Sequence, residues 1–320
     1  MKDHPLVTIG IPNYNYSDYI VETLNSVVSQ TYQNIELIIV DDLSTDNSIQ
    51  IINDWINNYK GSMQINFIKN NCNLGLTKAC NIILENANGK YFQPLDADDI
   101  ILPNKIEKQV QLLEYSLNTA FVYSNVAVIN ENGEVTNPDY CKRINYDKND
   151  MPSGNIFNDL LEFNFISLPS VLINTELGRK AGGFDETLHV QDYYMWLKLS
   201  QKNEVMYLPE TTAYYRIHPS SMSNAFWSSC VSEESVMVIK QRYFNECNNK
   251  LKKIIATNVQ NSSIFLYKHK YPSSKKWLSI AFKLNPGFKT LLYFIAVRMH
   301  VQYSFFEKVK QAFCIHNTDN

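Results

Sequence analysis

The chain has 320 residues, of which 45% are hydrophobic and 12% aromatic, so it can bury a sizeable core as one large globular domain or two ordinary ones. Its formal net charge of −3 conceals a division: residues 1–235 carry 15 basic and 29 acidic side chains, whereas residues 236–310 carry 14 basic and two acidic ones. An acidic body therefore precedes a basic tail.

Cysteine use and hydropathy exclude further classes of protein. The six cysteines show neither the paired spacing of a zinc site nor the density of a disulfide-stapled secreted domain, so free thiols in a reducing cytoplasm are expected. The N-terminus lacks the long apolar core of a signal peptide. The longest uncharged apolar stretch of the tail, "TLLYFIAV", is far short of the roughly 20 residues that span a bilayer. We expect a cytoplasmic protein that is soluble or peripheral to a membrane.

The first hundred residues alternate between strand and helix patterns. Short β-rich apolar runs predict strands at 6–12, 35–42, 64–70 and 89–96, and helical spacing predicts helices at 18–32, 44–59 and 75–87. Ser44, Thr45 and Asp46 are good capping residues for the second of these helices. The alternation predicts an α/β fold with a mostly parallel sheet and helices on both faces.

After residue 101 the alternation becomes less regular. Helices are expected at 104–116, 155–164 and 192–201, strands at 120–130, 170–174 and 212–218, a polar loop up to about residue 154 and a glycine turn at 181–184. The pattern after about residue 220 is helical throughout. We expect a domain over residues 1–224 and a basic, aromatic helical tail over residues 225–320.

Three polar clusters follow predicted strands: "PNYNYSDY" after the first, "DDLSTD" after the second and "DADD" after the fourth. Ligands of parallel α/β sheets bind beyond the carboxyl ends of the strands, so the three clusters are expected to converge on one cleft. The alternative for "DDLSTD" is that it only caps the following helix.

The carboxylates of Asp96, Asp98 and Asp99 repel one another directly after a buried strand, and local stability does not explain them. Residues two apart in an extended segment point to the same side, so Asp96 and Asp98 can share one ligand. Hard cations such as Mg²⁺ and Mn²⁺ prefer oxygen ligands and commonly bridge carboxylates to phosphates. A metal–diphosphate is the expected ligand, and relief of the repulsion by solvent is the alternative.

Glycine spacing narrows the class of phosphate ligand. No glycine occurs between Gly10 and Gly61, so neither a dinucleotide fingerprint nor a P-loop can follow the first or second strand. This disfavours dehydrogenases, P-loop kinases and the sugar nucleotidyltransferases, which cradle phosphates on a glycine-rich loop.

Five segments carry a resemblance to a known family, in order and in spacing. They are "VTIGIPNYNYSDYIVETLNSVVSQTYQNIELIIVDDLSTDNS", "NCNLGLTKACN", "LDADD", "GGFDETLHVQDYYMWLKLS" and "YYRIHPSSMS". Over about residues 5–224 the chain resembles the family 2 glycosyltransferases of GT-A fold. The resemblance implies a Rossmann-like catalytic domain over residues 1–224, with a nucleotide-sugar half at about 1–100 and an acceptor half at about 101–224.

The resemblance also implies the residues that bind the donor. A nucleotide pocket is expected at Pro12, Tyr14, Asp41 and Asp42. The glycine and the lysine of "NLGLTKACN", Gly75 and Lys78, are expected to border the donor. The family's DxD motif falls on Asp96, Ala97 and Asp98, with Asp98 the direct ligand of Mn²⁺ or Mg²⁺ and Asp99 a helper.

Two further residues receive roles from the same resemblance. Asp192 matches the second position of the family's Glu-Asp pair and is the expected catalytic base, while the first position is Gln191, a departure from the family. The alternative for Asp192 is a helix cap. His218 matches a position near the metal or diphosphate, and the alternative is a structural histidine.

The tail places Trp277, Ile280, Ala281 and Leu284 on one helical face. A basic helix of this kind can lie in an anionic membrane interface, with Trp277 and phenylalanines inserted shallowly. The alternative is that the face packs on the catalytic domain or on a second subunit of a homo-oligomer. No recognisable nucleic-acid module accompanies the basic charge, so nucleic acid is not expected as a partner.

The sequence therefore predicts a metal-dependent, inverting glycosyltransferase. It would move a sugar from a UDP-linked donor to a hydroxyl of a surface polysaccharide or its lipid-linked precursor, in the cytoplasm or on the inner face of the cell membrane. The alternative is a non-catalytic protein that binds sugar nucleotides or serves as a scaffold. The sugar and the acceptor linkage are not encoded in recognisable motifs.

Overall fold

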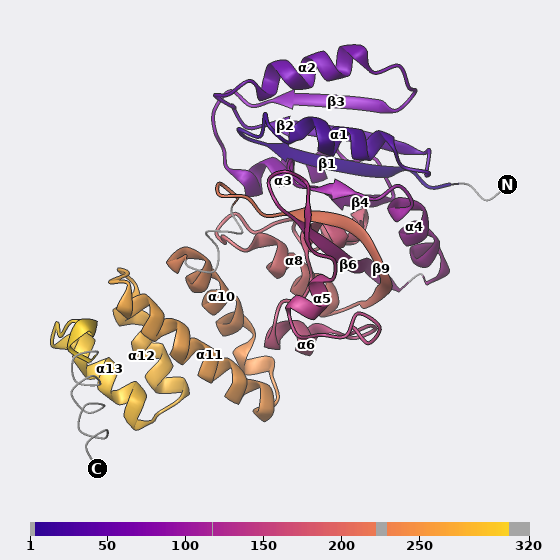
Figure 1. Ribbon diagram of the computed structural model, residues 1–320. Coiled ribbons are helices and arrows are strands. Elements are labelled where there is room, and N and C mark those ends of the chain that lie inside the picture. The colour runs from indigo at the N-terminus through magenta and orange to yellow at the C-terminus, as the bar shows by residue number, and fades with distance from the viewer. Residues whose placement is uncertain (1–3, 117, 222–228, 307–320) are drawn as a thin grey trace. The chain divides into compact units, whose positions relative to one another are not determined.

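The computed structural model describes residues 4–116, 118–221 and 229–306 and divides the chain into two compact units, residues 1–224 and 225–320 (Figure 1). The first unit contains a β-sheet flanked by helices, and the second consists of helices. All the site residues expected from the sequence lie in the first unit.

The described strands of the first unit form one nine-stranded sheet in the order β3-β2-β1-β4-β8-β6-β9-β5, with β7 paired to β6. The strands are β1 (Val7–Asn13), β2 (Ile35–Asp41), β3 (Gln64–Lys69), β4 (Tyr91–Pro94), β5 (Ile100–Ile101), β6 (Thr119–Ile129), β7 (Val135–Asn137), β8 (Leu172–Asn174) and β9 (Glu204–Arg216). The helices are α1 (Ile20–Val28), α2 (Ser48–Asn58), α3 (Leu76–Asn86), α4 (Lys105–Tyr115), α5 (Tyr140–Arg143), α6 (Phe157–Glu162), α7 (Thr175–Lys180) and α8 (Gln191–Ser200), with a 3₁₀ turn at Leu168–Ser170.

The strand directions bring several carboxyl ends to one edge of the sheet. Strands β3, β2, β1 and β4 pair in parallel. Strand β8 runs antiparallel to both β4 and β6, so β4 and β6 point the same way, and β9 is parallel to β6. The loops that follow β1, β2, β4, β6 and β9 therefore emerge at the same edge.

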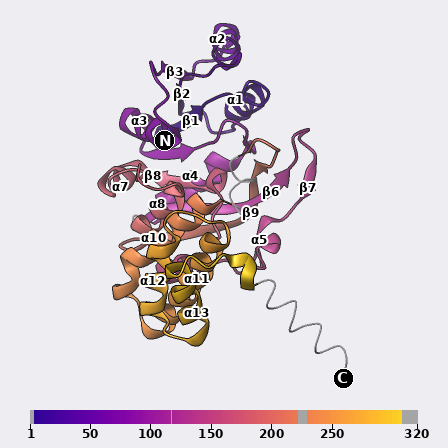
Figure 2. The same ribbon diagram turned by 90° about the vertical axis from the view of Figure 1, so that its left-hand side faces the viewer.

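Alternation along β1 explains why helices cover both faces of the sheet. Val7, Ile9 and Ile11 pack into the core that also contains residues of α1, α2 and α4. Gly10 faces the other side, where a Cβ would lie 2.2 Å from a methyl carbon of Ile83 on α3. Figure 2 shows α1 and α3 on opposite sides of β1 and β2. Glycine at position 10 is what allows α3 to approach the sheet this closely.

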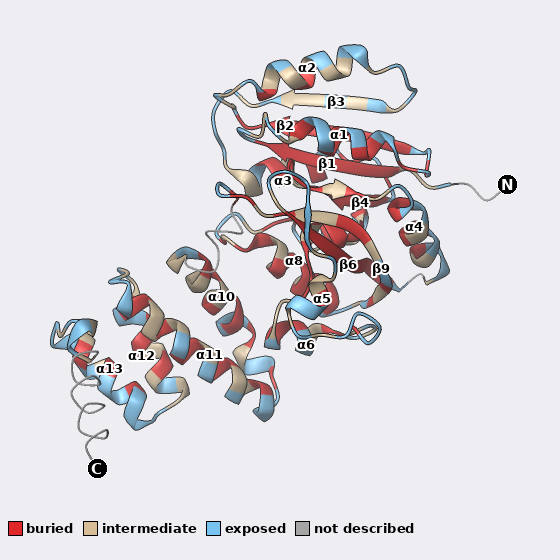
Figure 3. Cartoon of the chain, viewed as in Figure 1, coloured by how far each residue is buried: buried red, intermediate tan, exposed pale blue. Residues whose placement is uncertain are grey.

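Burial separates the central strands from the edge strand. All residues of β1, β2 and β6 are buried, whereas β3 at the edge mixes exposed and half-buried residues (Figure 3). Runs buried on both faces are typical of parallel sheets covered by helices. The expected fold class is confirmed, with its parallel pairing concentrated in β1–β4 and mixed pairing beyond.

The sequence patterns missed four short elements of this unit, β5, β7, α5 and α7. The last strand also begins at Glu204, eight residues before the expected start at residue 212, because its first half is largely exposed or half-buried and lacks a continuous apolar run. Strand β5 pairs with β9 and follows the acidic segment directly. It fixes where that segment rejoins the sheet.

The second unit consists of α10 (Cys230–Tyr243), a 3₁₀ turn (Phe244–Glu246), α11 (Asn249–Lys268), α12 (Ser274–Leu284) and α13 (Phe288–Arg298). The α12 face proposed for a membrane is partly buried instead, with Ile280 and Leu284 half-buried. Trp277 and Ala281 are fully buried, and the indole Nε1 of Trp277 donates to Oε1 of Glu234 at 2.8 Å. The expectation that Trp277 inserts into a membrane is wrong, because its side chain is fully buried. Among the described residues, no helix has both the length and the apolar character needed to cross a membrane.

Candidate active site

The loops after β1 and β2 are tied together by side chains. The hydroxyl of Ser44 accepts from the backbone N–H of Asn15 at 3.0 Å and donates to Oδ2 of Asp41 at 2.6 Å, and Asn13 donates to the same Asp41 oxygen at 2.7 Å. The oxygen Oδ1 of Asn15, a residue with φ of 62°, accepts from the backbone N–H of Thr45 at 2.8 Å. Ser44 and Thr45 therefore do not cap α2 as expected, and they hold the two loops in register.

Asp46, which directly precedes the N-cap residue Asn47, bonds to the first residue of α2 and to the loop after β1. Its Oδ1 accepts from the backbone N–H of Ser48, the first residue of α2, at 2.9 Å, and its Oδ2 accepts from Ser17 at 3.0 Å. The bonds to the helix and the loop hold its pKa below the usual value despite partial burial. One carboxylate thus links the start of α2 to the loop after β1.

Asp42 organises the segment that leads into α3. Its Oδ1 accepts from the side chain of Asn70 and the backbone N–H of Leu74, both at 2.8 Å, and its Oδ2 accepts from Gly75 at 2.7 Å. Gly75 has a φ of +89°, which favours glycine, and it directly precedes α3. Lys78 is exposed in the first turn of α3. Asp42 thereby fixes the loop that carries both residues expected beside the donor.

The remaining nucleotide-pocket candidates lie at the end of β1. Pro12 is buried within the strand, and Tyr14, just beyond it, is 42% exposed. Asp41 is fully buried at the end of β2. Tyr14 is consequently a side chain of this group that a ligand could contact directly.

The acidic segment forms a turn and not the extended run expected from the sequence. The backbone N–H of Asp99 donates to the backbone oxygen of Asp96 at 3.2 Å, which closes the turn. Carboxylate oxygens of Asp96, Asp98 and Asp99 all lie within 4.8 Å of one another. The alternation argument for Asp96 and Asp98 was therefore wrong in its geometry, while the turn gathers three carboxylates instead of two.

The electrostatics of this cluster are those of crowded, poorly solvated carboxylates. Burial of Asp96, together with the charges of Asp98 and Asp192, raises its pKa to about 8. Burial and the charges of Asp98 and Asp96 raise the pKa of Asp99 well above its usual value. Among the described residues, Oδ2 of Asp99 is a buried side-chain oxygen without a hydrogen-bond partner. A cation at this turn would reduce the repulsion between the carboxylates and would give the Asp99 oxygen a partner.

His218 lies beside the same turn, two residues after β9. Its Nε2 is 3.1 Å from Oδ2 of Asp98, and its Nδ1 is 3.0 Å from the hydroxyl of Ser220. The ring of Tyr19 approaches it with a centroid separation of 4.6 Å. The structure thus brings His218 and Asp98 together from positions 120 residues apart.

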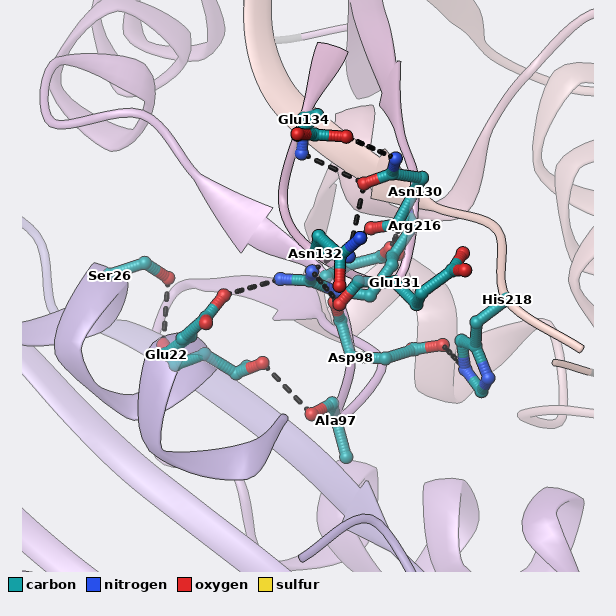
Figure 4. Close-up of polar contacts among 12 residues, drawn as sticks. Glu22, Ser26, Ala97, Asp98, Asn130, Glu131, Asn132, Glu134, Arg216 and His218 are labelled. Carbon is teal, nitrogen blue, oxygen red and sulfur yellow. Dashed lines mark hydrogen bonds and ion pairs between the residues drawn. The ribbon is translucent and has the colours of Figure 1, made fainter. Parts of the chain in front are cut away.

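Arg216, which sequence reasoning passed over, anchors the acidic turn (Figure 4). Its buried guanidinium donates from Nε to the backbone oxygen of Asp98 at 2.8 Å and from a terminal nitrogen to Oε2 of Glu22 on α1 at 2.5 Å. Its backbone N–H donates to Oδ1 of Asp99 at 2.9 Å. The hydroxyl of Thr23, also on α1, donates to the oxygen of Ala97 at 2.9 Å. The only sequence signal was an arginine two residues before His218.

Asp192 is the second residue of α8 and not its N-cap. Val190 occupies the N-cap position, so Asp192 is not the N-cap residue of this helix. Burial raises the pKa of Asp192, against an opposing effect of the backbone N–H groups of Tyr193 and Asp192 itself. Its charge also raises the pKa of Asp96 and, with Asp96, that of the buried Cys80 thiol on α3. Asp192 and the acidic turn therefore share one electrostatic environment.

Tyr16 is a second residue of this environment that received no role from the sequence. Burial raises the pKa of its hydroxyl, and the charges of Asp98, Asp96 and Asp99 raise it further. Its ring lies edge-on to that of His218, with centroids 6.0 Å apart. The loop after β1 is thereby joined to the acidic turn.

The carboxylate turn fits a divalent cation. Hard cations take oxygen ligands, and neutral imidazole is a further possible ligand, so Asp96, Asp98, Asp99 and His218 form a chemically suitable donor set. The unmatched oxygen of Asp99 and the raised pKa of Asp96 are the observations that support this fit.

Comparison with known proteins identifies the family of the chain. Residues 8–167 match the family model described as "Glycosyl transferase family 2". An uncharacterized glycosyltransferase of Rickettsia prowazekii is 32% identical over 226 residues, which are 69% of this chain and 66% of that protein. The Escherichia coli protein WfgD, named as a UDP-Glc:alpha-D-GlcNAc-diphosphoundecaprenol beta-1,3-glucosyltransferase, is 31% identical over 225 residues, 69% of this chain and 81% of that one. The chain thus matches just under two thirds of the length of the Rickettsia relative.

Solved structures show the same fold. The Staphylococcus aureus protein TarS, solved with UDP-GlcNAc, superposes with a TM-score of 0.66 at 18% identity, covering 88% of this chain and 82% of TarS. The mannosyltransferase PcManGT of Pyrobaculum calidifontis, solved with GDP-Man and Mn²⁺, gives a TM-score of 0.60 at 16% identity, covering 98% and 86%. The fold, the match to the family model and the order of the sequence motifs all agree. The chain belongs to glycosyl transferase family 2 and has the GT-A fold.

Proposed function

We propose that this protein is an inverting glycosyltransferase that moves a sugar from a UDP-linked donor to a hydroxyl of a lipid-linked saccharide in surface polysaccharide synthesis. The observation that supports the proposal is the effect of the Asp192 charge on the pKa of Asp96, within the turn that gathers the carboxylates of Asp96, Asp98 and Asp99. Sugar transfer requires a base for the acceptor hydroxyl and, next to it, a cation-binding cluster for the donor diphosphate.

Relatives support the choice of substrates. The name of WfgD specifies a UDP-glucose donor and an acceptor carried on diphosphoundecaprenol, and TarS was solved with UDP-GlcNAc. We extend the donor class, a UDP-sugar, and the acceptor class, a lipid-linked saccharide, to this chain. Residues 1–100 would form the nucleotide-sugar half of the domain and residues 101–224 the acceptor half.

The donor diphosphate would lie at the acidic turn. Asp98 and Asp96 would hold a divalent cation, with Asp99 and His218 completing the set of ligands. Bound Mn²⁺ or Mg²⁺ would supply Lewis-acid stabilisation of the negative charge on the departing diphosphate. Arg216 keeps the turn in place through the backbone oxygen of Asp98 and does not itself reach toward the substrate in this proposal.

The nucleotide would lie over the loops after β1 and β2. Tyr14 and Lys78 are exposed and can contact it, whereas Asp41 and Asp42 direct their oxygens to Asn13, Ser44 and the segment that ends at Gly75. The two aspartates would therefore shape the pocket by fixing its loops.

Asp192 would be the general base. Its carboxylate would accept the proton of the acceptor hydroxyl while that oxygen attacks the anomeric carbon opposite the diphosphate, so configuration is inverted. The raised pKa of Asp192 brings its proton affinity closer to that needed at neutral pH than an exposed aspartate would have. Gln191 beside it is buried and carries no charge.

A thermal-shift screen of nucleotides and nucleotide sugars, with and without Mn²⁺, tests the donor assignment. UDP and one or more UDP-sugars should stabilise the protein in Mn²⁺, by about 2.7 kcal/mol when the ligand is at 100 times its Kd. Stabilisation by no nucleotide would contradict the proposal. The non-catalytic alternative differs in a second assay, since a scaffold protein would bind a UDP-sugar and yet release no UDP in the presence of any acceptor.

A further inference from the structure

Helix α13 is apolar on two opposite sides. Thr290, Tyr293 and Ala296 are buried on its inner side, where Tyr293 and Ala296 join a cluster with Tyr267 of α11 and Leu278 of α12. The outer side also carries large apolar side chains, and all of them are exposed: Phe288 83%, Leu291 37%, Leu292 40%, Ile295 44% and Met299 70%. Figure 3 shows exposed residues along this helix.

The exposed residues form a single stripe, which we call the α13 stripe. Their positions are i, i+3, i+4, i+7 and i+11, which is the spacing of one helix face. Scattered apolar residues on a surface need no explanation, but a continuous stripe on a helix whose other side is already packed indicates a second apolar contact.

Basic groups border the α13 stripe. By helical spacing, Lys289 lies at one edge and Arg298 at the other, and both are exposed. The guanidinium of Arg298 lies 3.5 Å from the ring centroid of Phe294, which places its charge beside an apolar surface. Across residues 247–306 the sequence has ten basic residues and no aspartate or glutamate.

We propose that the α13 stripe docks the protein on a membrane surface rich in anionic lipid. The helix has 11 residues against the roughly 20 that span a bilayer, so it would lie in the plane of the interface. In that position the stripe enters the boundary between headgroups and acyl chains, while Lys289 and Arg298 extend toward anionic headgroups. The absence of acidic residues from 247 to 306 removes charges that an anionic surface would repel.

Charge also argues against a second copy of the chain as the occupant. Two copies joined through the α13 stripe would bring like charges at its edges together with no acidic residue of this segment to pair with them. A lipid surface supplies both the apolar layer and the negative charge.

The docking proposal goes beyond the proposed reaction and does not depend on it. It would hold the protein beside an acceptor anchored in the membrane, but its test measures binding to vesicles and not turnover. A protein that fails to bind vesicles could still transfer sugar, and a protein that transfers no sugar could still bind vesicles.

Co-sedimentation of the full chain with vesicles tests the proposal. Wild-type protein should bind vesicles that contain phosphatidylglycerol, bind phosphatidylcholine vesicles more weakly, and be partly released as salt rises. Ile295→Asp places a charge in the stripe and should lower the apparent affinity by about tenfold or more. Val231→Asp is the matched control, because Val231 is 45% exposed on α10 and should bind as wild type does. Replacing both edge charges, Lys289→Gln with Arg298→Gln, should reduce binding to anionic vesicles only.

Thermal unfolding of each variant verifies that the fold is retained, since Ile295 is on the outer side of the helix. Equal sedimentation of wild type and Ile295→Asp would overturn the proposal, as would absence of wild-type binding to any vesicle. A wild-type dimer in solution that Ile295→Asp converts to monomer, without vesicle binding, would show that a second copy covers the stripe.

Discussion

Arg216 and Asp98 are joined through the backbone: the buried guanidinium donates from Nε to the carbonyl oxygen of Asp98 at 2.8 Å. The same side chain donates to Glu22 on α1, and the backbone N–H of Arg216 donates to Asp99. One residue at the end of β9 therefore holds the acidic turn against a helix from the start of the chain. The positions of the carboxylates depend on this contact.

Replacing Arg216 should disturb the turn without removing any of its carboxylates. In Arg216→Lys a single ammonium cannot reach both the Asp98 oxygen and Glu22, so the free energy of unfolding should fall by about 3 kcal/mol. The Mn²⁺ concentration needed for UDP to stabilise the protein should rise, because the ligands are no longer held together. Denaturant unfolding and Mn²⁺ titration measure the two effects. An unchanged Mn²⁺ requirement in a destabilised variant would mean that Arg216 serves the fold alone.

Asp98→Ala tests the metal ligand. Stabilisation by UDP in wild type should require Mn²⁺ or Mg²⁺, and the variant should lose that metal-dependent part, because the remaining carboxylates give too few charges. Glu134→Ala is a suitable control, since Glu134 is an exposed acidic residue whose side chain bonds the nearby Asn130. A wild-type UDP shift that is equally large in EDTA would remove the metal from the account.

Asp192→Asn separates the base from the binding groups. Asparagine preserves size but cannot accept the proton, so transfer should fall by at least about a hundredfold while the KM for the donor changes little. Steady-state kinetics with donor and acceptor varied separately provide the measurement. Near-normal transfer by this variant would place the base elsewhere.

Lys105 is a buried residue near the acidic turn whose effect on the free energy of unfolding can be tested by changing the pH. It is fully buried, and its Nζ donates to the side-chain oxygens of Gln93 and Gln109 and, at 3.2 Å, to the backbone oxygen of Val171. Burial without a carboxylate lowers the pKa of Lys105 well below its usual value of 10.5. Strand β4, which carries Gln93, leads directly into the acidic turn.

The sign of its pH effect follows from proton binding. Between the lowered folded pKa and 10.5 the unfolded chain binds more protons at Lys105 than the folded chain, so stability rises with pH in that window. Lys105→Met lacks this contribution. The stability of wild type relative to the variant should therefore increase from about pH 7 to about pH 9, by at most about 1.4 kcal/mol per pH unit. Parallel stability curves would show that Lys105 keeps an ordinary pKa.

Local patterns were sufficient for the long elements of this fold. Continuous apolar runs placed β1 and β2 within a residue or so, because strands buried on both faces must be apolar throughout. Elements such as β5, with two residues, are too short to show periodicity and exist only because β9 offers a partner. Their positions are set by tertiary pairing that the local sequence does not contain.

In the candidate site, too, some residues could be identified from local sequence and others depend on tertiary contacts. The residues of the acidic turn could be picked out because three adjacent carboxylates are costly without a ligand. Arg216 received no role from the sequence, since its partner Glu22 lies 194 residues away and nothing in the sequence links the two. Asp42 was identified, but its bonds to Leu74 and Gly75 depend on a loop geometry visible only in the fold.

Transfer itself tests the central claim most directly. The full-length protein would be incubated with UDP-sugars, Mn²⁺ and a lipid-linked N-acetylglucosamine diphosphate, and both UDP release and the mass of the acceptor would be followed. The account predicts UDP release that requires the acceptor, a gain of one sugar in the product, and loss of both signals in EDTA and in Asp192→Asn. A protein that binds UDP-sugars but leaves every such acceptor unchanged, or that transfers equally well without Asp192, would contradict it.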